Sequence, residues 1–293
     1  MTGNADYSIK IAHVGTPGGV SLTLSGELRN RGYDSHVFVL NQGAFFKAER
    51  VSRLDLFTKL FMANLVHFHG RWKERPFGVD PKKVVYHYHG DDLRYLRKMI
   101  PHKDGVLHFA STPDILVDGV EWLPNPIKLE GFRPNLTRNQ VLSILHYPDT
   151  KFRMDSKGTP EIREKLAQFQ LQQETKDRFH YEEVSTLPHD ELLKKLSSCD
   201  IFIDQTRPGI YGMIAVEALA LGKPVIAHPN PDWYPFDSGN PFFRIDDLKD
   251  LIMHSEMRSE KSEIGLGYIK KVHDSHIVVD KLIRRYQDVG LVP

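Results

Sequence analysis

The stretch 199–228 constrains the fold of this chain more than any other part of the sequence. Two short apolar runs, 201–203 and 225–227, predict buried strands, and the longer apolar run 213–221 between them predicts a helix. Gly222 directly follows that run, and glycine ends helices because it adopts the left-handed conformation at little cost. The stretch therefore predicts a strand–helix–strand unit, which is typical of an α/β fold.

The loop that leads into this helix predicts an anion site. It carries Gly209 and Gly212, and free backbone N–H groups at a helix N-terminus favour a phosphate. Glu217 is the only charged residue in 213–221, so we expect it to be buried and partnered. Two roles are open for Glu217: an internal bond to a neighbouring Lys, Arg or loop N–H, or a grip on paired ligand hydroxyls at the C-terminal ends of the strands.

Length and composition narrow the class of protein. A chain of 293 residues suggests two domains, and a formal net charge of +1 gives no case for bulk affinity for nucleic acid or membranes. The single cysteine, Cys199, precludes an intrachain disulfide and fits a reducing compartment. The first residues hold no apolar signal core, and no run approaches the roughly 20 apolar residues of a membrane span. We therefore expect a cytoplasmic protein that does not bind nucleic acid.

The N-terminal half begins like a nucleotide-binding domain. A strand over 9–14, a loop with Gly18 and Gly19, and a helix over 21–31 follow one another, without the G-x-G-x-x-G spacing of dinucleotide folds. Further along, the strand ends 65–70 and 84–92 each carry alternate histidines on one face. Such spacing could bind a metal. We expect instead that these histidines line a cleft or pack there, and we predict no metal site.

A charged stretch and a proline-rich connector come next. The basic residues of 94–103 predict a solvated helix face, with contact to an acidic acceptor or to lipid phosphates, and so to a membrane surface, as the alternative. The prolines of 122–134 predict a rigid link, which places a domain boundary near 125–139.

The C-terminal half opens with a strand over 141–146, and its following loop ends in Lys157 and Gly158. Thr159 is expected to cap the helix that starts at Pro160. A lysine followed by glycine at a helix start is suited to bind phosphate, because it combines a point charge with N–H donors. A further strand over 179–184, a helix from 188 and a last helix over 276–286 complete the predicted elements.

The run from Gly209 to Ala227, GIYGMIAVEALALGKPVIA, resembles the donor-site signature of GT-B glycosyltransferases of family 4. This resemblance implies an α/β fold of two Rossmann-like domains that face each other across a cleft. It assigns 1–125 to an acceptor-side domain and 139–275 to a nucleotide-sugar donor domain. The C-terminal helix, about 276–293, is expected to pack back on the first domain.

The resemblance also implies a role for individual residues. Glu217 matches the glutamate that holds the donor ribose, whereas Gly209 stands where the family's first glutamate contacts the transferred sugar. The expected catalytic residues are Lys157 and Arg153, which bind the diphosphate, and His89, which lies against the donor sugar; Arg153 is preferred over Lys151. The expected donor-binding residues are Gly18, Gly19, Glu217, Ile210, Tyr211 and Gly212, with the backbone of Thr186 and Leu187 at the base.

The implied activity is transfer of a sugar from a nucleotide diphosphate donor to a hydroxyl acceptor, with anomeric configuration retained. A hexosyltransferase-like, metal-independent enzyme that needs no cofactor is expected, with a glycan, a lipid-linked molecule or a small molecule as acceptor. Two alternatives stay open: a GT-B subunit that binds a nucleotide sugar without transferring it, and a sugar-nucleotide epimerase on the same scaffold. The base, the sugar, the acceptor and the oligomeric state are not predicted.

Overall fold

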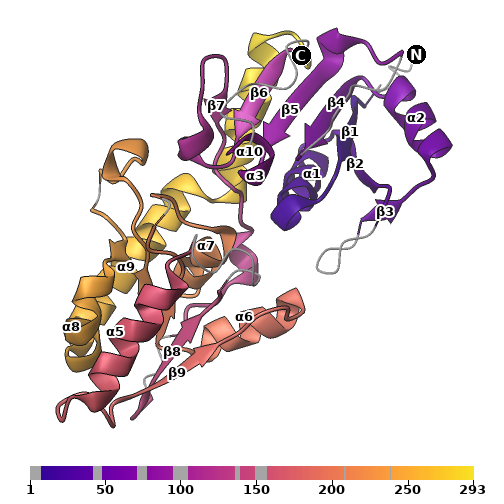
Figure 1. Ribbon diagram of the computed structural model, residues 1–293. Helices are drawn as coiled ribbons and strands as arrows, with labels where there is room; N and C mark the ends of the chain where they lie inside the picture. Colours follow the sequence, from indigo (N-terminus) through magenta and orange to yellow (C-terminus); the bar gives the residue numbers. More distant parts are fainter. Residues whose placement is uncertain are drawn as a thin grey trace. The chain divides into compact units, whose positions relative to one another are not determined.

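The computed structural model describes residues 8–41, 48–70, 78–94, 105–135, 139–148, 157–207, 209–237 and 239–293, with side chains at all of these except 91 and 92. The chain divides into two compact units. Unit 1 comprises Met1–Pro126 and Ser275–Pro293, and unit 2 comprises Ile127–Asp274. Each unit is built on its own parallel β-sheet (Figure 1).

Unit 1 contains a parallel sheet of seven strands in the described part of the chain, in the order β3-β2-β1-β4-β5-β6-β7. The strands are β1 (Lys10–Val14), β2 (Asp34–Val39), β3 (Glu49–Arg50), β4 (Leu65–His69), β5 (Val84–Tyr88), β6 (Leu107–Ala110) and β7 (Glu121–Trp122). The strand order reverses between β1 and β4. In open parallel sheets such a switch point is where ligands bind, beyond the carboxyl ends of the strands.

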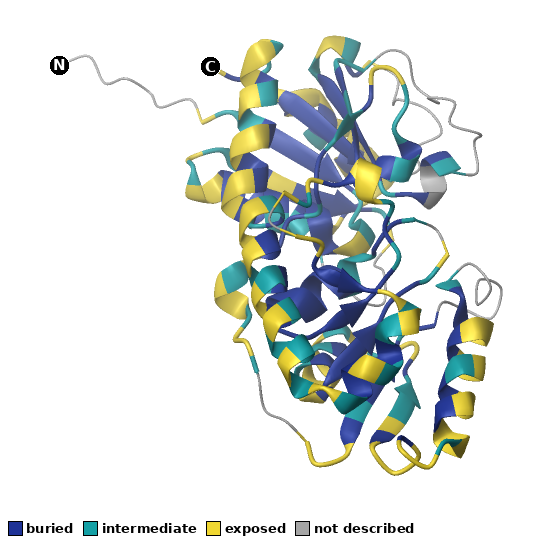
Figure 2. Ribbon diagram, turned by 90° about the vertical axis from the view of Figure 1, so that its left-hand side faces the viewer, coloured by how far each residue is buried: buried dark blue, intermediate teal, exposed yellow. Residues whose placement is uncertain are grey.

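Helices cover both faces of this sheet. They are α1 (Val20–Asn30), α2 (Arg53–Met62), α3 (Asp91–Arg94) and α10 (Ser275–Asp288), with 3-10 turns η1 (Pro17–Gly19), η2 (Pro81–Lys83) and η3 (Pro113–Ile115). On one face Leu24 and Leu28 of α1 and Leu282 of α10 pack on Ile11 and other apolar residues of the strands. The α2 helix lies on the opposite face (Figure 1). The central strands β1, β4, β5 and β6 are almost entirely buried, as Figure 2 shows in dark blue, whereas the edge strand β3 is exposed.

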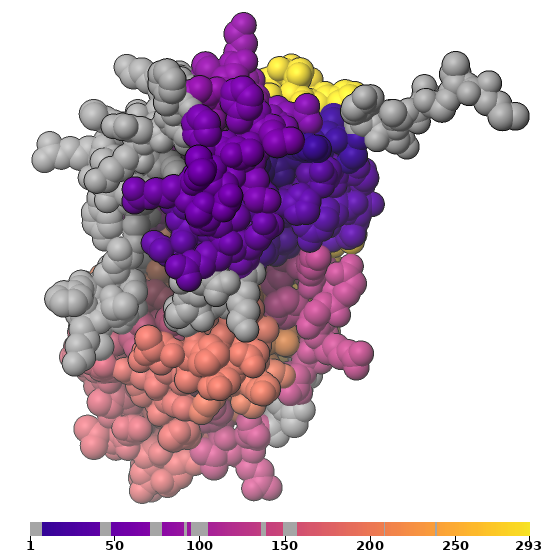
Figure 3. Space-filling view, turned by 90° about the vertical axis from the view of Figure 1, so that its right-hand side faces the viewer, coloured from indigo at the N-terminus to yellow at the C-terminus, as the bar shows by residue number. Residues whose placement is uncertain are grey.

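The α2 helix is apolar on its outer side as well as its inner one. Leu56 and Leu60 are buried against the sheet. The large apolar side chains that it leaves exposed are Leu54, Phe57, Phe61 and Met62. In the space-filling view the purple side chains of this region stand at the surface of unit 1 (Figure 3).

Unit 2 contains a parallel sheet of five strands among the described residues, in the order β12-β11-β10-β8-β9. The strands are β8 (Leu142–His146), β9 (Phe179–Glu183), β10 (Ile201–Ile203), β11 (Val225–Ile226) and β12 (Phe242–Phe243). The switch point of this sheet therefore lies between β8 and β10, which pair directly through Ile201 and Ile144.

The helices of unit 2 also lie on both faces. They are α5 (Thr159–Leu171), α6 (His189–Ser198), α7 (Met213–Ala220), α8 (Leu248–Met253) and α9 (Ser255–Val272), with turns η4 (Leu129–Gly131), η5 (Pro231–Trp233) and η6 (Ile245–Asp247). Apolar residues of α5 and α8, such as Ile162 and Leu251, pack on one face of the sheet.

The predicted fold class, α/β with two Rossmann-like parallel sheets, is confirmed. One predicted detail is wrong: α5 begins at Thr159, and Gly158, not Thr159, is its N-cap. None of the helices in the described part of the chain combines the length and the apolar composition that a membrane crossing requires.

Candidate functional site

The switch point of unit 2 brings Lys157 and Gly212 together at one buried carboxylate. Asp204 directly follows β10 and is 1% exposed. Its Oδ2 accepts a hydrogen bond from the Gly212 N–H at 2.6 Å, and its Oδ1 lies 3.7 Å from Lys157 Nζ. Lys157 Nζ also donates to the Tyr147 carbonyl at 3.1 Å, and its side chain is 15% exposed. A cation, a carboxylate and a helix N-terminus thus meet at the edge where a ligand is expected.

The N-terminus of α7 keeps open donors beside this carboxylate. Gly212 is the N-cap of α7, and its carbonyl accepts from Ala215 and Val216 at 3.1 and 3.3 Å. Among the described residues nothing accepts a hydrogen bond from the N–H groups of Met213 and Ile214. These orphan donors and the positive end of the helix dipole suit an anion.

Gly158 is required by the close packing of two loops. Its φ of +76° lies in the left-handed region, and a Cβ added there would lie 2.0 Å from Thr206 Oγ1. The Thr206 N–H donates to the Lys157 carbonyl at 3.0 Å, which ties the loop after β10 to the start of α5. A side chain at residue 158 would therefore force these loops apart, and the lysine with them.

His146, at the end of β8, fixes the start of α5 from below. Its Nδ1 donates to the Ile203 carbonyl at 2.8 Å, so its Nε2 accepts from Thr159 Oγ1 at 2.9 Å. Burial lowers the pKa of His146 to about 4, which keeps the ring neutral and this arrangement intact. The hydroxyl of Thr159 is thereby committed to the core, which explains why it does not cap the helix.

Glu217 has a histidine as its partner. The carboxylate is 4% exposed, and its Oε1 accepts from His189 Nε2 at 2.6 Å. The hydrogen bond and charge of Glu217 raise the pKa of His189 above its ordinary value, because they favour the protonated ring. His189 opens α6, and its side chain stays 30% exposed, so the pair leads from the interior of unit 2 to its surface.

Ile210 and Tyr211 anchor the loop from inside. Tyr211 is buried, and its hydroxyl lies 2.6 Å from the Tyr268 hydroxyl and 2.8 Å from His273 Nε2. Burial raises the pKa of Tyr211 well above its ordinary value. Ile210 is buried too, and its carbonyl accepts from Gln205 Nε2 at 3.0 Å. These side chains hold the backbone of the loop, which is the part expected to face a ligand.

Gly209 leaves little space for the glutamate that the family resemblance places there. Its φ is +70°, and an added Cβ would lie 3.1 Å from the Trp233 ring. The Gly209 carbonyl is also held by the Asn230 N–H at 2.8 Å. A glutamate at this position would need a strained backbone and a displaced tryptophan.

Thr186 carries backbone strain. Its φ of +56° is the one positive value of a non-glycine residue in the described part of the chain. For a β-branched residue this conformation is an outlier, and such strain clusters at binding sites. Thr186 is exposed and Leu187 half-buried, in the connection between β9 and α6, where the resemblance predicts backbone contacts to the base.

In unit 1, Gly18 and Gly19 form a tight turn at the start of α1. Both adopt left-handed conformations, with φ of +57° and +73°, and Gly19 is the N-cap of the helix. A Cβ on Gly18 would meet nothing within 4 Å, so that residue borders open space. Upstream, Gly15 approaches the backbone of β4, since its Cβ would lie 2.7 Å from the His69 carbonyl oxygen.

His89 lies at the end of β5 within a group of histidines. Its Nε2 is 3.2 Å from His69 Nδ1, and its Nδ1 is 2.8 Å from Ser111 Oγ. Burial lowers the pKa of His89 to about 3, so the half-buried ring is neutral at physiological pH. Two groups of three histidines place their ligand atoms within 4.8 Å of one another: His13, His67 and His69, and His69, His87 and His89.

Two further features bear on the predicted sites. Arg153, and Lys151 beside it, lie outside the described residues.

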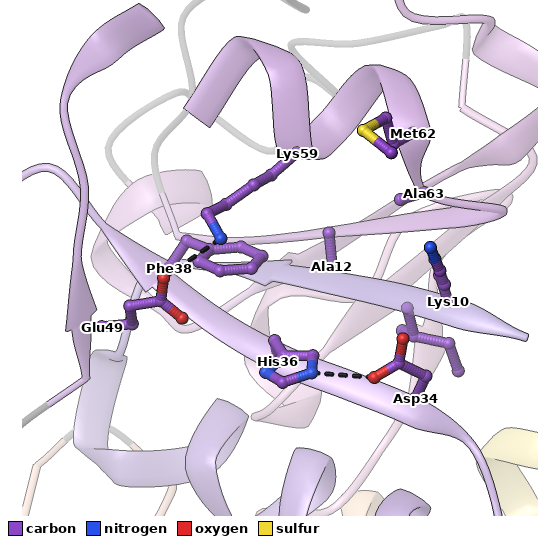
Figure 4. A pocket seen from close by; sticks show the side chains of 10 residues that line it. Lys10, Ala12, Asp34, His36, Phe38, Glu49, Lys59, Met62 and Ala63 are labelled. Carbon is purple, nitrogen blue, oxygen red and sulfur yellow. Dashed lines mark hydrogen bonds and ion pairs between the residues drawn. The ribbon is translucent and has the colours of Figure 1, made fainter. Parts of the chain in front are cut away.

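A hollow of about 270 Å³ lies in unit 1 between β1, β2 and α2, where Lys59 Nζ sits 4.7 Å over the Phe38 ring (Figure 4). None of the candidate residues lines this hollow.

The described part of unit 2 thus gathers Lys157 and Gly212 around Asp204 at the β8–β10 switch point, and Glu217 lies in the α7 helix that follows. The glycine turn and His89 belong to unit 1. Asp204 and His189 are absent from the sequence prediction. The aspartate directly after the predicted strand 201–203 was a usable signal for the first. Nothing in the sequence points to the second, because 28 residues separate His189 from its partner Glu217.

No family model and no curated protein matches this sequence. Solved structures do resemble it. Sucrose-phosphate synthase (tll1590) from Thermosynechococcus elongatus superposes with a TM-score of 0.59 and 13% identity, over 96% of this chain and 99% of that one. The α,α-trehalose-phosphate synthase (UDP-forming) from Burkholderia vietnamiensis superposes with a TM-score of 0.62 and 10% identity, over 97% of this chain and 98% of that one. The UDP-GlcNAc 2-epimerase from Neisseria meningitidis, bound to UDP-GlcNAc, superposes with a TM-score of 0.50 and 14% identity, over 94% of this chain and 100% of that one.

These likenesses define the class of fold. The two synthases are GT-B glycosyltransferases, and the two Rossmann-like units of this chain have the GT-B fold. Because an epimerase shares it, the fold by itself does not decide between transfer and isomerisation.

Proposed function

We propose that this protein is a glycosyltransferase that moves a sugar from a nucleotide diphosphate donor to a hydroxyl acceptor. The observation that carries the proposal is the meeting of Lys157 and the Gly212 loop at Asp204, on the switch point of unit 2. In this assignment residues 139–275 bind the donor and residues 1–125 the acceptor. Membership of family 4, retention of anomeric configuration, a hexosyl donor and independence from metal ions and other cofactors rest on the resemblance of 209–227 to that family's signature.

The chemistry that this arrangement supports is stabilisation of the leaving group. Departure of a nucleoside diphosphate concentrates negative charge on phosphate oxygens, which preorganised donors can meet. The Lys157 ammonium has three N–H donors, and the described contacts use one of them in a hydrogen bond, to Tyr147. In our proposal a phosphate oxygen takes the place of Asp204 beside this ammonium. The N–H groups of Met213 and Ile214 then face the same charge.

Asp204 would hold the loop while the diphosphate binds. Its Oδ2 keeps the Gly212 N–H at 2.6 Å, and the Thr206 N–H keeps the Lys157 carbonyl at 3.0 Å. Neither bond has to open when the lysine side chain turns to a phosphate. The backbone of both loops thus stays fixed while the diphosphate binds, and a fixed backbone is what preorganised N–H donors require.

Glu217 is proposed to bind the donor ribose. One of its oxygens is committed to His189, and paired hydroxyls of a ribose would donate to the other or share the first. Glu217 raises the pKa of His189, which favours a protonated ring next to the carboxylate and so lowers the cost of burying it.

The alternative function is a GT-B subunit that binds a nucleotide sugar without transferring it. The glycine at position 209 favours this alternative, since it supplies no carboxylate near the transferred sugar. We also propose that the basic stretch 94–103 contacts an acidic acceptor or a membrane surface. Arg94, from the basic stretch 94–103, pairs with Asp114 at 2.7 Å, and the rest of that stretch lies outside the described residues.

The decisive experiment incubates the protein with UDP, GDP and ADP sugars. Thermal unfolding identifies the donor, because a ligand at about 100 times its Kd stabilises the folded state by about 2.7 kcal/mol. Product analysis of that donor then separates the functions. Slow release of free nucleoside diphosphate supports the transferase, and acceptor screening with anomeric analysis by NMR tests retention.

Two other results would contradict the proposal. Tight donor binding without release of nucleoside diphosphate, with or without acceptors, indicates a binding subunit. Conversion of the donor to an isomer without release indicates an epimerase.

A further inference from the structure

Five histidines of unit 1 form a continuous array on the face of the sheet that α1 and α10 cover. They stand at the carboxyl ends of three neighbouring strands, with His13 on β1, His67 and His69 on β4, His87 on β5 and His89 just after it. The strand register pairs His13 with His67 and His69 with His87. Ring centroids of neighbours lie 4.2–5.5 Å apart. The array therefore starts at the β1–β4 switch point and crosses to β5.

Hydrogen bonds connect most, but not all, of the ring nitrogens. His13 Nδ1 lies 2.9 Å from His69 Nε2, and His69 Nδ1 lies 3.2 Å from His89 Nε2. His67 Nδ1 is 2.7 Å from the hydroxyl of Tyr286. Three nitrogens have no partner and no contact with solvent: His13 Nε2, His67 Nε2 and His87 Nδ1. Buried nitrogens without a partner are rare in native proteins and call for a bound water, an ion or a functional role.

The histidines of this array are neutral ligands. Burial lowers the pKa of each of the five, and the neighbouring rings lower it further for His67, His69 and His87. A neutral imidazole keeps one lone pair, which is the group that binds zinc, copper and similar ions. In the described part of the chain both groups with metal-ligand spacing consist of histidine alone, so the hard, oxygen-seeking ions Ca²⁺ and Mg²⁺ do not fit.

We propose that His13, His67 and His69 form a buried site for a borderline transition-metal ion of the zinc class. Their ligand atoms lie within 4.8 Å of one another. Around a tetrahedral ion with bonds of 2.0–2.1 Å the ligand atoms stand about 3.3 Å apart, so each ring would move by less than about 1 Å. Three imidazoles leave a fourth position for water or hydroxide, as in nitrogen-ligated zinc sites.

This group of three is favoured over His69, His87 and His89 for two reasons. It holds two of the three unpartnered nitrogens, on His13 and His67, whereas the other group holds one. Its three rings are fully buried, whereas His89 is half-buried and bonded to Ser111 Oγ. His69 has both nitrogens in hydrogen bonds, so it binds the ion by giving up its bond to His13.

The surroundings already supply hydrogen-bond partners for the outer ring nitrogens of metal-bound histidines. With the lone pair of His67 Nε2 on the ion, His67 Nδ1 carries the proton and donates to Tyr286, which comes from α10. When His69 binds through Nε2, its Nδ1 donates to His89 Nε2, which fixes the tautomer of His89. The metal site itself does not depend on the proposed transferase activity.

The test uses the full chain, purified without a histidine tag, stripped with chelator and dialysed. Zn²⁺ alone is titrated in, with binding followed by calorimetry and elemental analysis. We expect roughly one ion per chain and a rise in Tm. Co²⁺ in its place should give the intense visible absorption of a tetrahedral site. His67→Gln should remove the stoichiometric site. Tyr286→Phe, which keeps the ring but not the hydroxyl, should weaken Zn²⁺ binding by about 10–100-fold.

The matched control is His36→Gln, because His36 is exposed on β2 and pairs with Asp34 at 2.8 Å outside the array. This variant should bind like the parent protein. If His67→Gln does not fold, the Tyr286→Phe affinity and the Co²⁺ spectrum decide. Three results would overturn the proposal: no stoichiometric ion in the folded parent chain, unchanged affinity in folded His67→Gln or Tyr286→Phe, or a Co²⁺ spectrum of octahedral type. Any of these would leave water as the partner of the unpaired nitrogens.

Discussion

The two switch points of this protein carry opposite chemistry at equivalent places in their sheets. In unit 2 the end of β10 and the loop after β8 present a charged pair, Asp204 and Lys157, 3.7 Å apart. In unit 1 the ends of β1 and β4 present histidines such as His13, whose pKa burial lowers to about 3. A partly exposed ammonium beside a carboxylate can exchange that partner for a phosphate, whereas neutral imidazoles offer lone pairs and attract cations. We therefore propose an anion site in one unit and a cation site in the other, on similar backbones.

The largest expected effect comes from removing the charge in unit 2. Lys157→Ala should lower turnover of the donor by about 10²–10³-fold, because one preorganised donor to the leaving group is lost. The variant should fold but unfold at a lower temperature than the parent chain, because the buried Asp204 loses the ammonium beside it, so turnover is compared at a temperature where both proteins are folded. Steady-state kinetics on the donor identified by the thermal screen measures the effect.

Lys165→Ala is the matched control for this prediction. Lys165 lies on the same helix, α5, and pairs with the exposed Asp246 at 2.8 Å, so turnover should be unchanged. Near-normal turnover in Lys157→Ala would contradict the role assigned to the unit 2 switch point, because the charged pair would then have no part in the reaction.

The second effect tests how tightly unit 2 holds its charged pair. Gly158→Ala should destabilise unit 2 by about 2–4 kcal/mol, through left-handed backbone strain together with overpacking against Thr206. Labelling of Cys199 by a thiol reagent measures the opening of this unit, since the cysteine is buried and its pKa is raised to about 12. Adding Thr206→Ala to the Gly158→Ala chain should restore the stability lost to overpacking. It should not restore the stability lost to backbone strain.

Gly267→Ala provides the control for glycine replacement. Gly267 lies in α9, and an added Cβ meets nothing within 4 Å, so this change should stabilise the protein by about 0.4–1 kcal/mol. Equal labelling rates in Gly158→Ala and the parent chain would show that the two loops can separate freely.

The smallest effect concerns the charge next to Glu217. His189→Ala should cost about 1–3 kcal/mol of stability, because the buried carboxylate loses its hydrogen-bonded partner. The pKa of His189 is raised in the folded state, so its stabilisation is fully present below the unfolded value near 6.5. It is lost as the pH rises through the higher folded pKa. Urea unfolding of parent and variant should therefore differ more at about pH 5.5 than at about pH 8.5.

His180→Ala is the control for the pH experiment, because His180 is exposed on β9, away from Glu217. It should behave like the parent chain at both pH values. A difference between His189→Ala and the parent chain that grew toward high pH would contradict the assigned direction of the pKa shift.

Elements whose signal is local were predicted well from the sequence. The apolar run 201–203 is β10, and the run 213–221 is α7 with its end one residue earlier, since Leu221 is the C-cap. Apolar clustering and a glycine stop depend on neighbours in the chain, so they can be read without the fold. The cap of α5 was predicted wrongly, because Thr159 pairs with His146 on β8, a contact between residues that are 13 apart.

Site contacts that depend on strand order could not be predicted. The alternate histidines of β4 and β5 were visible, but His13 joins them only because β1 lies beside β4 in the sheet. Likewise, Asp204 meets Lys157 only because β10 pairs with β8. Periodicity describes which face a side chain occupies along one strand, and it carries no information about which strands are neighbours.

The route of α10 has a consequence for how the chain assembles during synthesis. Its residues Val278, Val279, Leu282 and Tyr286 are 0–2% exposed within unit 1, although that unit otherwise ends at Pro126. A ribosome therefore releases every residue of unit 2, which is one continuous stretch, before it delivers the helix that closes unit 1. Unit 1 is synthesised first but completes its fold last. Until α10 is made, the apolar face of α1 that it covers stays open to chaperones.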